Sequence, residues 1–452
     1  MSEARRTITN EANCSIIDGK RVLLYLRLRM IITMRSIIRR AENCLLRPYG
    51  WGKSQVQRLQ KPRPVNFPID FVITWVDGSD PEWRKSRALY MQKDVDYEGN
   101  SESRYRDWGW LKYWFRAVEQ YAPWVNKVYF VTCGQKPDWL NLQHEKLVFV
   151  THQDFIPAEY LPTFNSNTIE LNLWRIPGLS EHFVYFNDDV FLNRPVMPED
   201  FFHNGLPKLC SLAIPFRYMY YENGLDKWFR MVLNDIAVIN SSFDIREAIR
   251  KHPEKFFSYV FRRQAKINKM VFDYNGIAGM FHTHTVQIFQ KEVFREIWNR
   301  WSAVLDRTCR FRFRNEEQVT PFLPALWQIF EGEYYPERIR YFGKYFPLAS
   351  HTLQQVLEAL RSGKHRFLCL NDAKKTDRET DDAICTIQKT IKHAMEAKFP
   401  DSSRYEKIDT QLQQRGFCRQ VRSRHFQHCH HPQFGGGRRY RDANKQRRVQ
   451  HD

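Results

Sequence analysis

The chain has 452 residues, 42% of them hydrophobic, so it can bury a large core and exceeds the length of one ordinary domain. Its formal net charge of +19 favours an anionic partner, which is nucleic acid, an acidic membrane surface or a phosphorylated substrate. The nine cysteines form no Cys-x-x-Cys pair and are odd in number, which excludes an evident disulfide framework and favours a reducing cytoplasm.

Residues 1–66 form a basic N-terminal arm with one helix, expected over Arg21–Arg40. Its apolar residues recur at helical spacing at Leu23, Leu26, Met30, Met34, Ile37 and Ile38. Most of its arginines fall on the other side, so the helix either lies in the plane of a membrane surface or packs on the main domain. No uninterrupted apolar stretch reaches the roughly 18–20 residues that a membrane span needs, and no secretory signal is evident. We therefore expect a cytoplasmic protein, with at most peripheral contact at the inner face of the membrane.

A buried sheet is predicted to begin after the proline-containing linker Lys61–Pro68. The nearly continuous apolar run Ile69–Val76 is typical of a strand that is buried on both faces. Asp80 followed by Pro81 has the pattern of a helix N-cap with proline at the first helical position. A second amphipathic helix is expected over Trp108–Val118.

Further strands and helices alternate along the next stretch of the chain. The expected strands are Lys127–Thr132, Leu147–Thr151 and Phe183–Phe186, and the helix Thr168–Ile176 is expected between the last two. This alternation predicts an α/β fold with a mostly parallel sheet flanked by helices. In such sheets, ligands lie beyond the carboxyl ends of the strands.

The second half of the chain is more helical. Helices are expected over Lys291–Leu305, Val319–Phe330 and Asp382–Phe399, and a short strand over Phe367–Leu370. Residues 408–452 are rich in arginine, glutamine and glycine, which predicts a basic flexible tail.

The run Asn187-Asp188-Asp189 directly follows the apolar strand Phe183–Phe186. Two adjacent carboxylates repel each other unless a positive group lies nearby. Mg²⁺ is a suitable partner, because it binds one or two carboxylates together with substrate phosphates. A solvated turn is the competing interpretation, since Asn and Asp are common turn residues. The strong strand before the run favours a functional site.

Two other residues are candidates for the same chemistry. Asp77 ends the first strand, where a nucleotide would bind, although an aspartate before glycine is also a common turn residue. His284, in the run His282-Thr283-His284, is a candidate general base, and a buried structural histidine is an equal alternative. Zinc is disfavoured, because no cysteine or third histidine lies at ligand spacing.

Arg310, Arg312 and Arg314 precede the acidic pair Glu316-Glu317. Arginine can bind a phosphate through two parallel N–H groups, so this stretch can hold a phosphorylated substrate. Taken alone, it is more simply interpreted as a solvated charged surface.

These stretches together resemble the Stealth family of sugar-phosphate transferases, in four regions at about 69–83, 103–192, 284–330 and 369–406. The motifs that carry the resemblance are Trp75-Val76-Asp77-Gly78 in the first region and Ser103-Arg104-Tyr105 and Phe186-Asn187-Asp188-Asp189 in the second. The third region contains His284, and the fourth contains Cys369-Leu370-Asn371-Asp372. The resemblance covers residues 67–407, which we expect to form the catalytic domain. Two positions depart from the family pattern: Trp110 stands where an acidic residue is usual, and Val286 where proline is usual.

The resemblance implies a Rossmann-like (GT-A-like) sheet with a helical accessory part. It also implies transfer of a sugar 1-phosphate from a nucleotide-diphosphate sugar to a hydroxyl of a polysaccharide or glycan, in capsule or exopolysaccharide synthesis. A nucleoside monophosphate would leave. The residues implied to hold Mg²⁺ or Mn²⁺ are Asp188, Asp189, Asn371 and Asp372.

The resemblance further implies roles for the remaining candidates. His284 would be the base, Asp77 would orient the donor or the acceptor, and Arg104 and Arg314 would stabilise the phosphate oxygens. The candidates for substrate binding are Glu170, Asn187 and Glu317.

Two rival functions stay open at this point. A metal-dependent glycosyltransferase would use the same acidic pair but release a nucleoside diphosphate. A nucleic-acid-binding protein would account for the net charge through the two basic termini, but not for residues 69–190. The expected partners are therefore a nucleotide sugar and a glycan, with at most peripheral membrane contact and no specific nucleic acid.

Overall fold

The computed structural model describes residues 19–91, 100–214, 227–281, 284–372 and 379–407. Contacts group residues 1–406 into one compact unit and residues 407–452 into another. The predicted tail, residues 408–452, lies outside the described residues.

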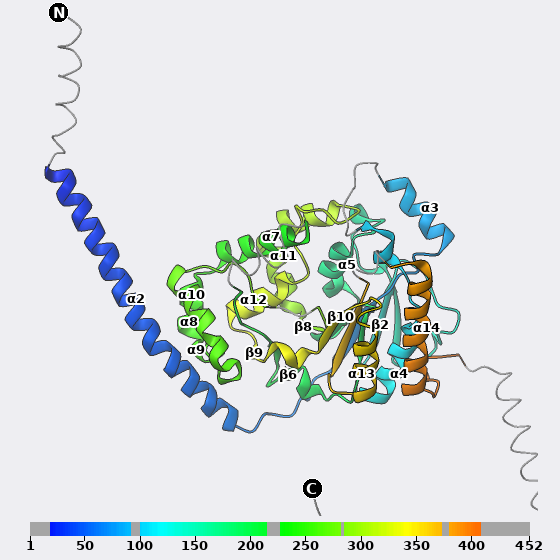
Figure 1. The fold of residues 1–452 in the computed structure, drawn as a ribbon. Coiled ribbons are helices and arrows are strands. Elements are labelled where there is room, and N and C mark those ends of the chain that lie inside the picture. Colours follow the sequence, from blue (N-terminus) through cyan, green and yellow to red (C-terminus); the bar gives the residue numbers. More distant parts are fainter. Residues whose placement is uncertain (1–18, 92–99, 215–226, 282–283, 373–378, 408–452) are drawn as a thin grey trace, which may run out of the picture. The chain divides into compact units, whose positions relative to one another are not determined.

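A five-stranded sheet in the order β3-β2-β1-β4-β8 forms the centre of the first unit (Figure 1). Its strands are β1 (Ile69–Thr74), β2 (Val128–Thr132), β3 (Leu147–Thr151), β4 (His182–Phe186) and β8 (Gln287–Gln290). The first four pair in parallel, and only β8 runs antiparallel, against β4. The predicted α/β fold with a mostly parallel sheet is therefore confirmed.

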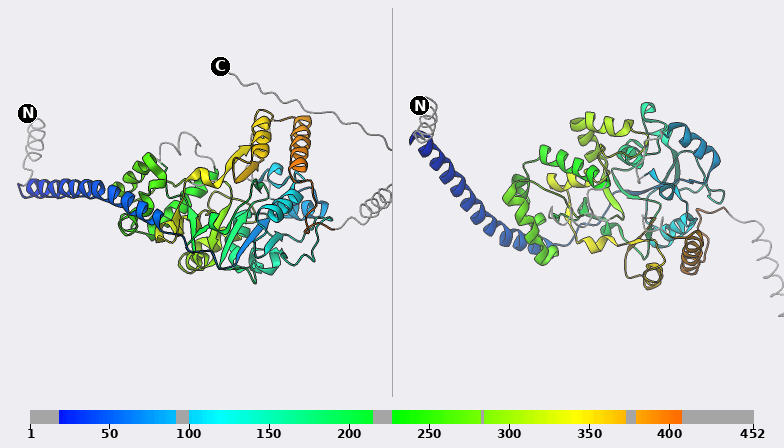
Figure 2. Two further views of the ribbon diagram at one scale, coloured as in Figure 1. Left: turned by 90° about the horizontal axis from the view of Figure 1, so that it is seen from below. Right: turned by 45° about the horizontal axis from the view of Figure 1, so that its top comes forward.

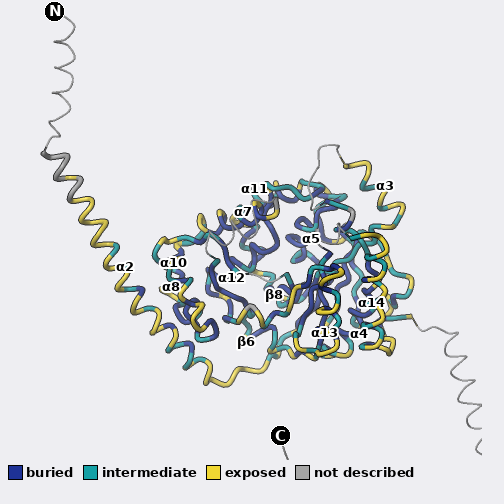
Figure 3. Tube along the Cα trace, in the orientation of Figure 1, coloured by how far each residue is buried: buried dark blue, intermediate teal, exposed yellow. Residues whose placement is uncertain are grey.

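The apolar runs predicted as buried strands are buried. Phe71, Val72 and Ile73 of β1 are fully enclosed, because strands and helices cover both faces of the sheet (Figure 3). Helix α4 (Leu111–Tyr121) packs on the sheet through Trp114, whose ring meets that of Phe186 edge to face at 5.4 Å.

The helix α3 (Pro81–Tyr90) begins as predicted. The carboxylate of Asp80 accepts hydrogen bonds from the backbone N–H groups of Glu82 and Trp83, which otherwise lack partners within the helix. The next helix, α4, begins later than predicted. Gly109 adopts φ 72°, outside the helical range, and its N–H donates to the side chain of Asp107, so the chain turns before the helix starts.

A second sheet joins distant parts of the chain beside the first. Its order is β10 (Lys344–Pro347), β11 (Phe367–Asn371), β5 (Val190–Leu192), with β11 antiparallel to β5. Cys369 of β11 lies opposite Val190, immediately after the acidic pair. Helices α13 (Leu353–Ser362) and α14 (Asp381–Lys398) lie side by side next to this sheet (Figure 2).

Helices and a small third sheet make up most of the rest of the unit. They are α5 (Ser166–Asn172), β6 (Phe202–His203), β7 (Leu206–Leu209), α7 (Lys227–Ser242), α8 (Ile245–Lys251), α9 (Pro253–Phe256), α10 (Lys266–Tyr274), α11 (Lys291–Arg310), α12 (Leu323–Glu331) and β9 (Tyr335–Pro336). The 3₁₀ turns that bear on the argument are Glu102–Tyr105 and Leu173–Arg175, and the latter ends the segment expected as helix 168–176. The remaining 3₁₀ turns are His152–Asp154, Ala158–Tyr160, Pro198–Asp200, Tyr259–Ala265 and Ile339–Phe342.

The helix expected over Arg21–Arg40 is much longer. Helix α2 spans Gly19–Leu59 and continues through Pro48. Its second half packs on α9 and α10 (Figure 1). Of the two alternatives for this helix, packing on the main domain is therefore observed for its second half. Within the described residues, no helix combines the length and hydropathy that a membrane span requires.

Candidate active site

The acidic pair lies in the tight connection between β4 and β5, at the carboxyl end of β4. The backbone N–H of Val190 donates to the carbonyl of Asn187 at 3.0 Å and closes the turn. The hydroxyl of Tyr185 donates to Oδ1 of Asn187 at 2.6 Å. The backbone N–H of Leu370 donates to the carbonyl of Asp189 at 2.8 Å, which ties the turn to β11.

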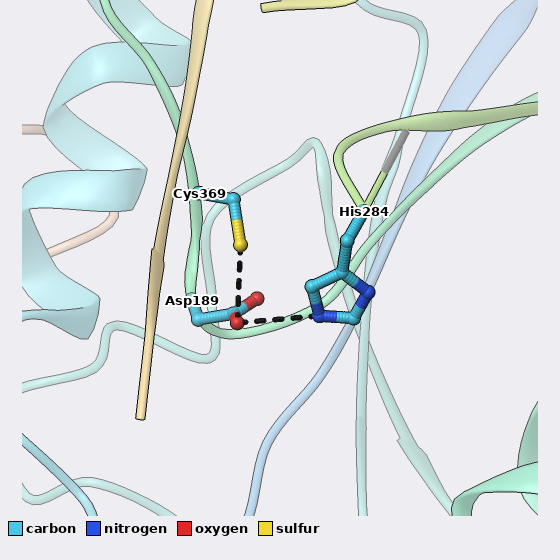
Figure 4. Close-up of side chains that lie close together, drawn as sticks. All are labelled: Asp189, His284 and Cys369. Carbon is cyan, nitrogen blue, oxygen red and sulfur yellow. Dashed lines mark hydrogen bonds and ion pairs between the residues drawn. The ribbon is translucent and has the colours of Figure 1, made fainter. Parts of the chain in front are cut away.

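The two carboxylate oxygens of Asp189 have different surroundings. Oδ2 accepts from Nδ2 of Asn371 at 2.7 Å and from Sγ of Cys369 at 3.3 Å, and it lies 3.5 Å from Nε2 of His284 (Figure 4). Burial alone would raise the pKa of Asp189, but the charge of His284 and these hydrogen bonds outweigh it and lower that pKa. Oδ1 is buried and has no hydrogen-bond partner among the described residues.

Three further carboxylates are linked to Asp189 by successive electrostatic interactions. Burial raises the pKa of Asp188 well above its usual range, and the charges of Asp189 and Asp107 raise it further. Burial also raises the pKa of Asp107, and the negative charge of Asp77 raises it further. Asp77, Asp107, Asp188 and Asp189 therefore share one electrostatic environment at the ends of β1 and β4.

Asp107 is a candidate site residue that the sequence analysis missed. Trp110, which occupies the position where the family usually has an acidic residue, is buried and stacks on Trp108 with ring centroids 5.1 Å apart. Asp107 supplies a carboxylate just before this stack. The departure at Trp110 was the available signal, because it invited a search for a nearby acidic residue.

These side chains fit a divalent cation. Side-chain ligand atoms of Asp189, His284 and Cys369 lie within 4.8 Å of one another. Burial raises the pKa of Cys369, so its thiol stays protonated and donates to Asp189 instead of serving as a thiolate ligand. The unpartnered Oδ1 of Asp189 and the crowded carboxylates then favour a cation that prefers oxygen ligands, such as Mg²⁺ or Mn²⁺.

Two arginines supply positive charge near these carboxylates. Nη1 of Arg104 donates to the backbone carbonyl of Asp372 at 3.2 Å. Burial and the charge of Arg314 lower the pKa of Arg104, while Asp372 and Asp189 oppose the shift, so Arg314, Asp372 and Asp189 each lie near Arg104. Arg314 is held by Ser166, whose Oγ accepts from Nη2 at 2.5 Å. Its neighbours point elsewhere: Arg310 pairs with Asp306 at 2.8 Å, and Arg312 donates to the carbonyl of Pro162 at 2.9 Å.

Glu170 is buried on α5 and interacts electrostatically with Arg314. Burial raises its pKa to about 7, although the charge of Arg314 and hydrogen bonds with Ser166 and Tyr185 lower it. Glu170 therefore shares Ser166 with Arg314, and it titrates near neutral pH.

The remaining predicted site residues have other partners within the protein or no described contact with the cluster. Oδ1 of Asn371 accepts from the hydroxyl of Tyr345 at 3.2 Å, and Oδ2 of Asp372 pairs with Arg106 at 2.9 Å, so protein groups already engage both side chains. Oδ1 of Asp77 accepts from the backbone N–H of Ser79 at 2.8 Å and from its hydroxyl at 2.6 Å, which is a turn role. Glu317 is exposed, and no described contact joins it to the cluster. His282 lies outside the described residues.

Comparison with known proteins identifies relatives of this chain. Stealth protein conserved region 1 matches residues 67–95, and conserved region 2 matches residues 104–209. The capsular polysaccharide phosphotransferase WcwK of Streptococcus pneumoniae is 40% identical over 343 residues, which cover 75% of this chain and 99% of WcwK. The exopolysaccharide phosphotransferase cps2G of Lactiplantibacillus plantarum is 37% identical over 342 residues, covering 75% of this chain and 97% of cps2G.

A solved bifunctional glycosyltransferase, WbbM, aligns with 75% of this chain and 53% of its own at 9% identity. Its TM-score of 0.30 is too low to add to the argument. The sequence matches to conserved regions 1 and 2 and to two nearly full-length relatives show that this chain is a phosphotransferase of the Stealth family.

Proposed function

We propose that the enzyme transfers a sugar 1-phosphate from a nucleotide-diphosphate sugar to a hydroxyl of a surface polysaccharide. The observation that carries the proposal is the position of Asp189, which faces His284 through one oxygen and leaves the other buried and unpartnered. The names of the relatives, a capsular and an exopolysaccharide phosphotransferase, support a polysaccharide as the acceptor.

His284 is the base in this proposal. In this proposal Nε2, which lies 3.5 Å from Oδ2 of Asp189, carries the N–H, and the ring presents Nδ1 on the side away from Asp189 (Figure 4). The His284 side chain is 39% exposed, so an acceptor hydroxyl can reach it. Nδ1 takes the proton of that hydroxyl as its oxygen attacks the phosphorus that carries the sugar.

The attack forms one oxygen–phosphorus bond and breaks another. The new bond joins the acceptor oxygen to the sugar-bearing phosphorus, and the broken bond is the bridge between the two phosphates. The electron pair of the broken bond leaves with the nucleoside monophosphate. Arg104 and Arg314 lie where they can stabilise charge on the non-bridging oxygens.

Asp188 and Asp189 would hold the divalent cation, with Asp107 adding negative charge nearby. When bound, the cation neutralises the diphosphate and keeps it in position. Asn371 and Asp372 have supporting roles: Asn371 orients Asp189, and Asp372 fixes Arg106 and accepts from Arg104 through its backbone.

The main rival is a glycosyltransferase that uses the same groups to attack the anomeric carbon. The two reactions differ in the fate of the phosphate next to the sugar. Purified enzyme should therefore be incubated with short glycan acceptors, Mg²⁺ or Mn²⁺, and nucleotide sugars labelled with ³²P at that phosphate. Phosphotransfer moves the label to the glycan and releases a nucleoside monophosphate.

Label that stays in a released nucleoside diphosphate would overturn the proposal in favour of the glycosyltransferase. The acceptor must then carry new sugar without label, which the same chromatogram shows. An Asp189→Ala enzyme is the blank, since it retains the protein but lacks the residue on which both reactions depend.

A further inference from the structure

Helix α2 has one side that packs on α9, α10 and the turn Tyr259–Ala265, within the unit formed by residues 1–406. Nδ2 of Asn43 donates to Oδ1 of Asp273 at 3.0 Å, and Oγ of Ser54 accepts from the backbone N–H of Tyr259 at 3.0 Å. Asn43 and Ser54 are the most deeply buried polar residues of the helix. These contacts fix which side of α2 faces inward.

The opposite side of α2 is apolar and exposed along its length. Its apolar residues are Met30, Ile31, Met34, Ile37, Ile38, Leu45, Tyr49, Val56 and Leu59. With about 100° of rotation per residue, all of them lie on the side facing away from Asn43 and Ser54. Exposed fractions of 61% for Ile38 and 72% for Leu45 show that the compact unit leaves this stripe uncovered (Figure 3). An apolar stripe of this length exceeds the scattered exposed side chains of an ordinary surface.

Arginines lie mainly on the side of α2 away from the stripe. With about 100° of rotation per residue, the exposed Arg29, Arg40 and Arg47 lie within about 60° of Asn43, and Arg35 lies on one flank of the stripe. Arg27 lies within the stripe near its start, where a long side chain can extend its charge past the apolar layer. From residue 19 to residue 41 the helix contains no Asp or Glu.

We propose that α2 binds in the plane of an anionic lipid surface, with this stripe among the acyl chains and its arginines at the headgroups. A continuous apolar stripe opposite a basic side is the pattern of an in-plane interfacial helix. Anionic headgroups complement the charge, because each arginine near such a surface contributes about 1 kcal/mol to binding. A second copy of the chain fits less well, because residues 19–41 of that copy would bring no carboxylate to these arginines.

The inference can be tested by flotation of the full-length protein with vesicles. The vesicles contain phosphatidylcholine alone or phosphatidylcholine mixed with phosphatidylglycerol. The wild type should float with the mixed vesicles, should bind the neutral ones weakly, and should lose affinity as salt is raised.

Two matched variants separate the stripe from general charge. Met34→Glu/Ile38→Glu places two carboxylates on the stripe, and Leu28→Glu/Ile32→Glu places two on the side of α2 that faces inward further along the helix. All four positions are exposed, so neither variant should disturb packing. Both lose the same net charge, but only the first loses apolar burial, so it should bind at least about tenfold more weakly than the second. Transfer to a short soluble acceptor should be the same in both.

Failure of the wild type to bind the mixed vesicles would overturn the inference. Equal affinities of the two double variants would also overturn it, because binding would then reflect charge alone. A concentration-dependent dimer in sedimentation experiments without lipid, lost only in the stripe variant, would assign the stripe to self-association instead. None of these outcomes depends on which product the transfer reaction releases.

Discussion

The two carboxylate oxygens of Asp189 have different partners, which suits them to different roles. Oδ2 accepts from Asn371 and Cys369 and lies near His284, and Oδ1 is buried without a hydrogen-bond partner among the described residues. One residue thus orients the proposed base and offers a ligand position for the cation. Loss of its charge should therefore affect proton transfer and cation binding together.

Replacing Asp189 with Asn tests this double role. Asp189→Asn keeps the size of the side chain and removes its charge, so we expect turnover to fall by about three orders of magnitude. Steady-state transfer assays measure the loss, and circular dichroism checks the fold. Asp138→Asn, at an exposed aspartate, is the control and should keep wild-type turnover. Comparable losses in the two variants would remove Asp189 from the site.

Replacing His284 tests the base separately. His284→Gln should lower turnover by about two to four orders of magnitude, the usual contribution of a positioned base. Donor affinity should change little, because the arginines and the cation ligands stay in place. Turnover near the wild-type value would assign proton removal to another group, such as Asp77.

Glu170 gives a prediction about pH. Its pKa is about 7 in the folded protein and near 4.5 in the unfolded chain, so the unfolded chain loses the proton first. The free energy of unfolding therefore falls as pH rises through this window, and Glu170→Gln removes the fall. Relative to wild type, the variant should gain roughly 2 kcal/mol between pH 5 and pH 8. Chemical denaturation at both pH values measures this gain, and a difference independent of pH would contradict it.

At the scale of elements, local patterns predicted most strands and helices. The apolar runs of β1 and β4 needed no distant information, and the N-cap at Asp80 marked the start of α3. The acidic pair was chosen as a candidate because it ends a predicted strand, which the structure contains as β4.

Features that depend on chain direction or on distant contacts were not predicted. Asp107 is followed by a turn at Gly109, and periodicity does not report a left-handed residue. The pairing of β5 with β11 brings Cys369 to Asp189, and no local pattern contains it. Helix α2 was ended too early, because its second half is fixed by packing on α9 and α10 and not by its own apolar stripe.

The turn before α4 can be tested through its glycine. No atom lies within 4 Å of a Cβ added at Gly109, so Gly109→Ala meets only the cost of its positive φ, about 1 kcal/mol of stability. Gly109→Asn should cost less, since Asn tolerates this conformation better. Gly52, within helix α2, also has open space, but there Ala should be neutral or stabilising. Equal effects of Ala at the two positions, measured by denaturation, would contradict the role of the turn.

At the scale of the whole molecule, the basic C-terminal run and the candidate active site belong to different units of the chain. Every described site residue lies in the unit formed by residues 1–406, whereas the basic run after residue 408 lies outside it. We therefore expect that deleting residues 408–452 leaves transfer to short acceptors unchanged and weakens salt-sensitive retention on nucleic acid. Paired activity and filter-retention assays measure the two effects. Loss of transfer together with retention would tie the tail to catalysis.

The pairing of β5 with β11 also sets the order in which activity appears during synthesis. Cys369 and Asn371 leave the ribosome about 180 residues after Asp189, the carboxylate to which they donate. A nascent chain that has already folded the first four strands holds its acidic pair without these donors. We expect such a chain to gain transferase activity only after Asn371 has been synthesised and β11 has paired with β5.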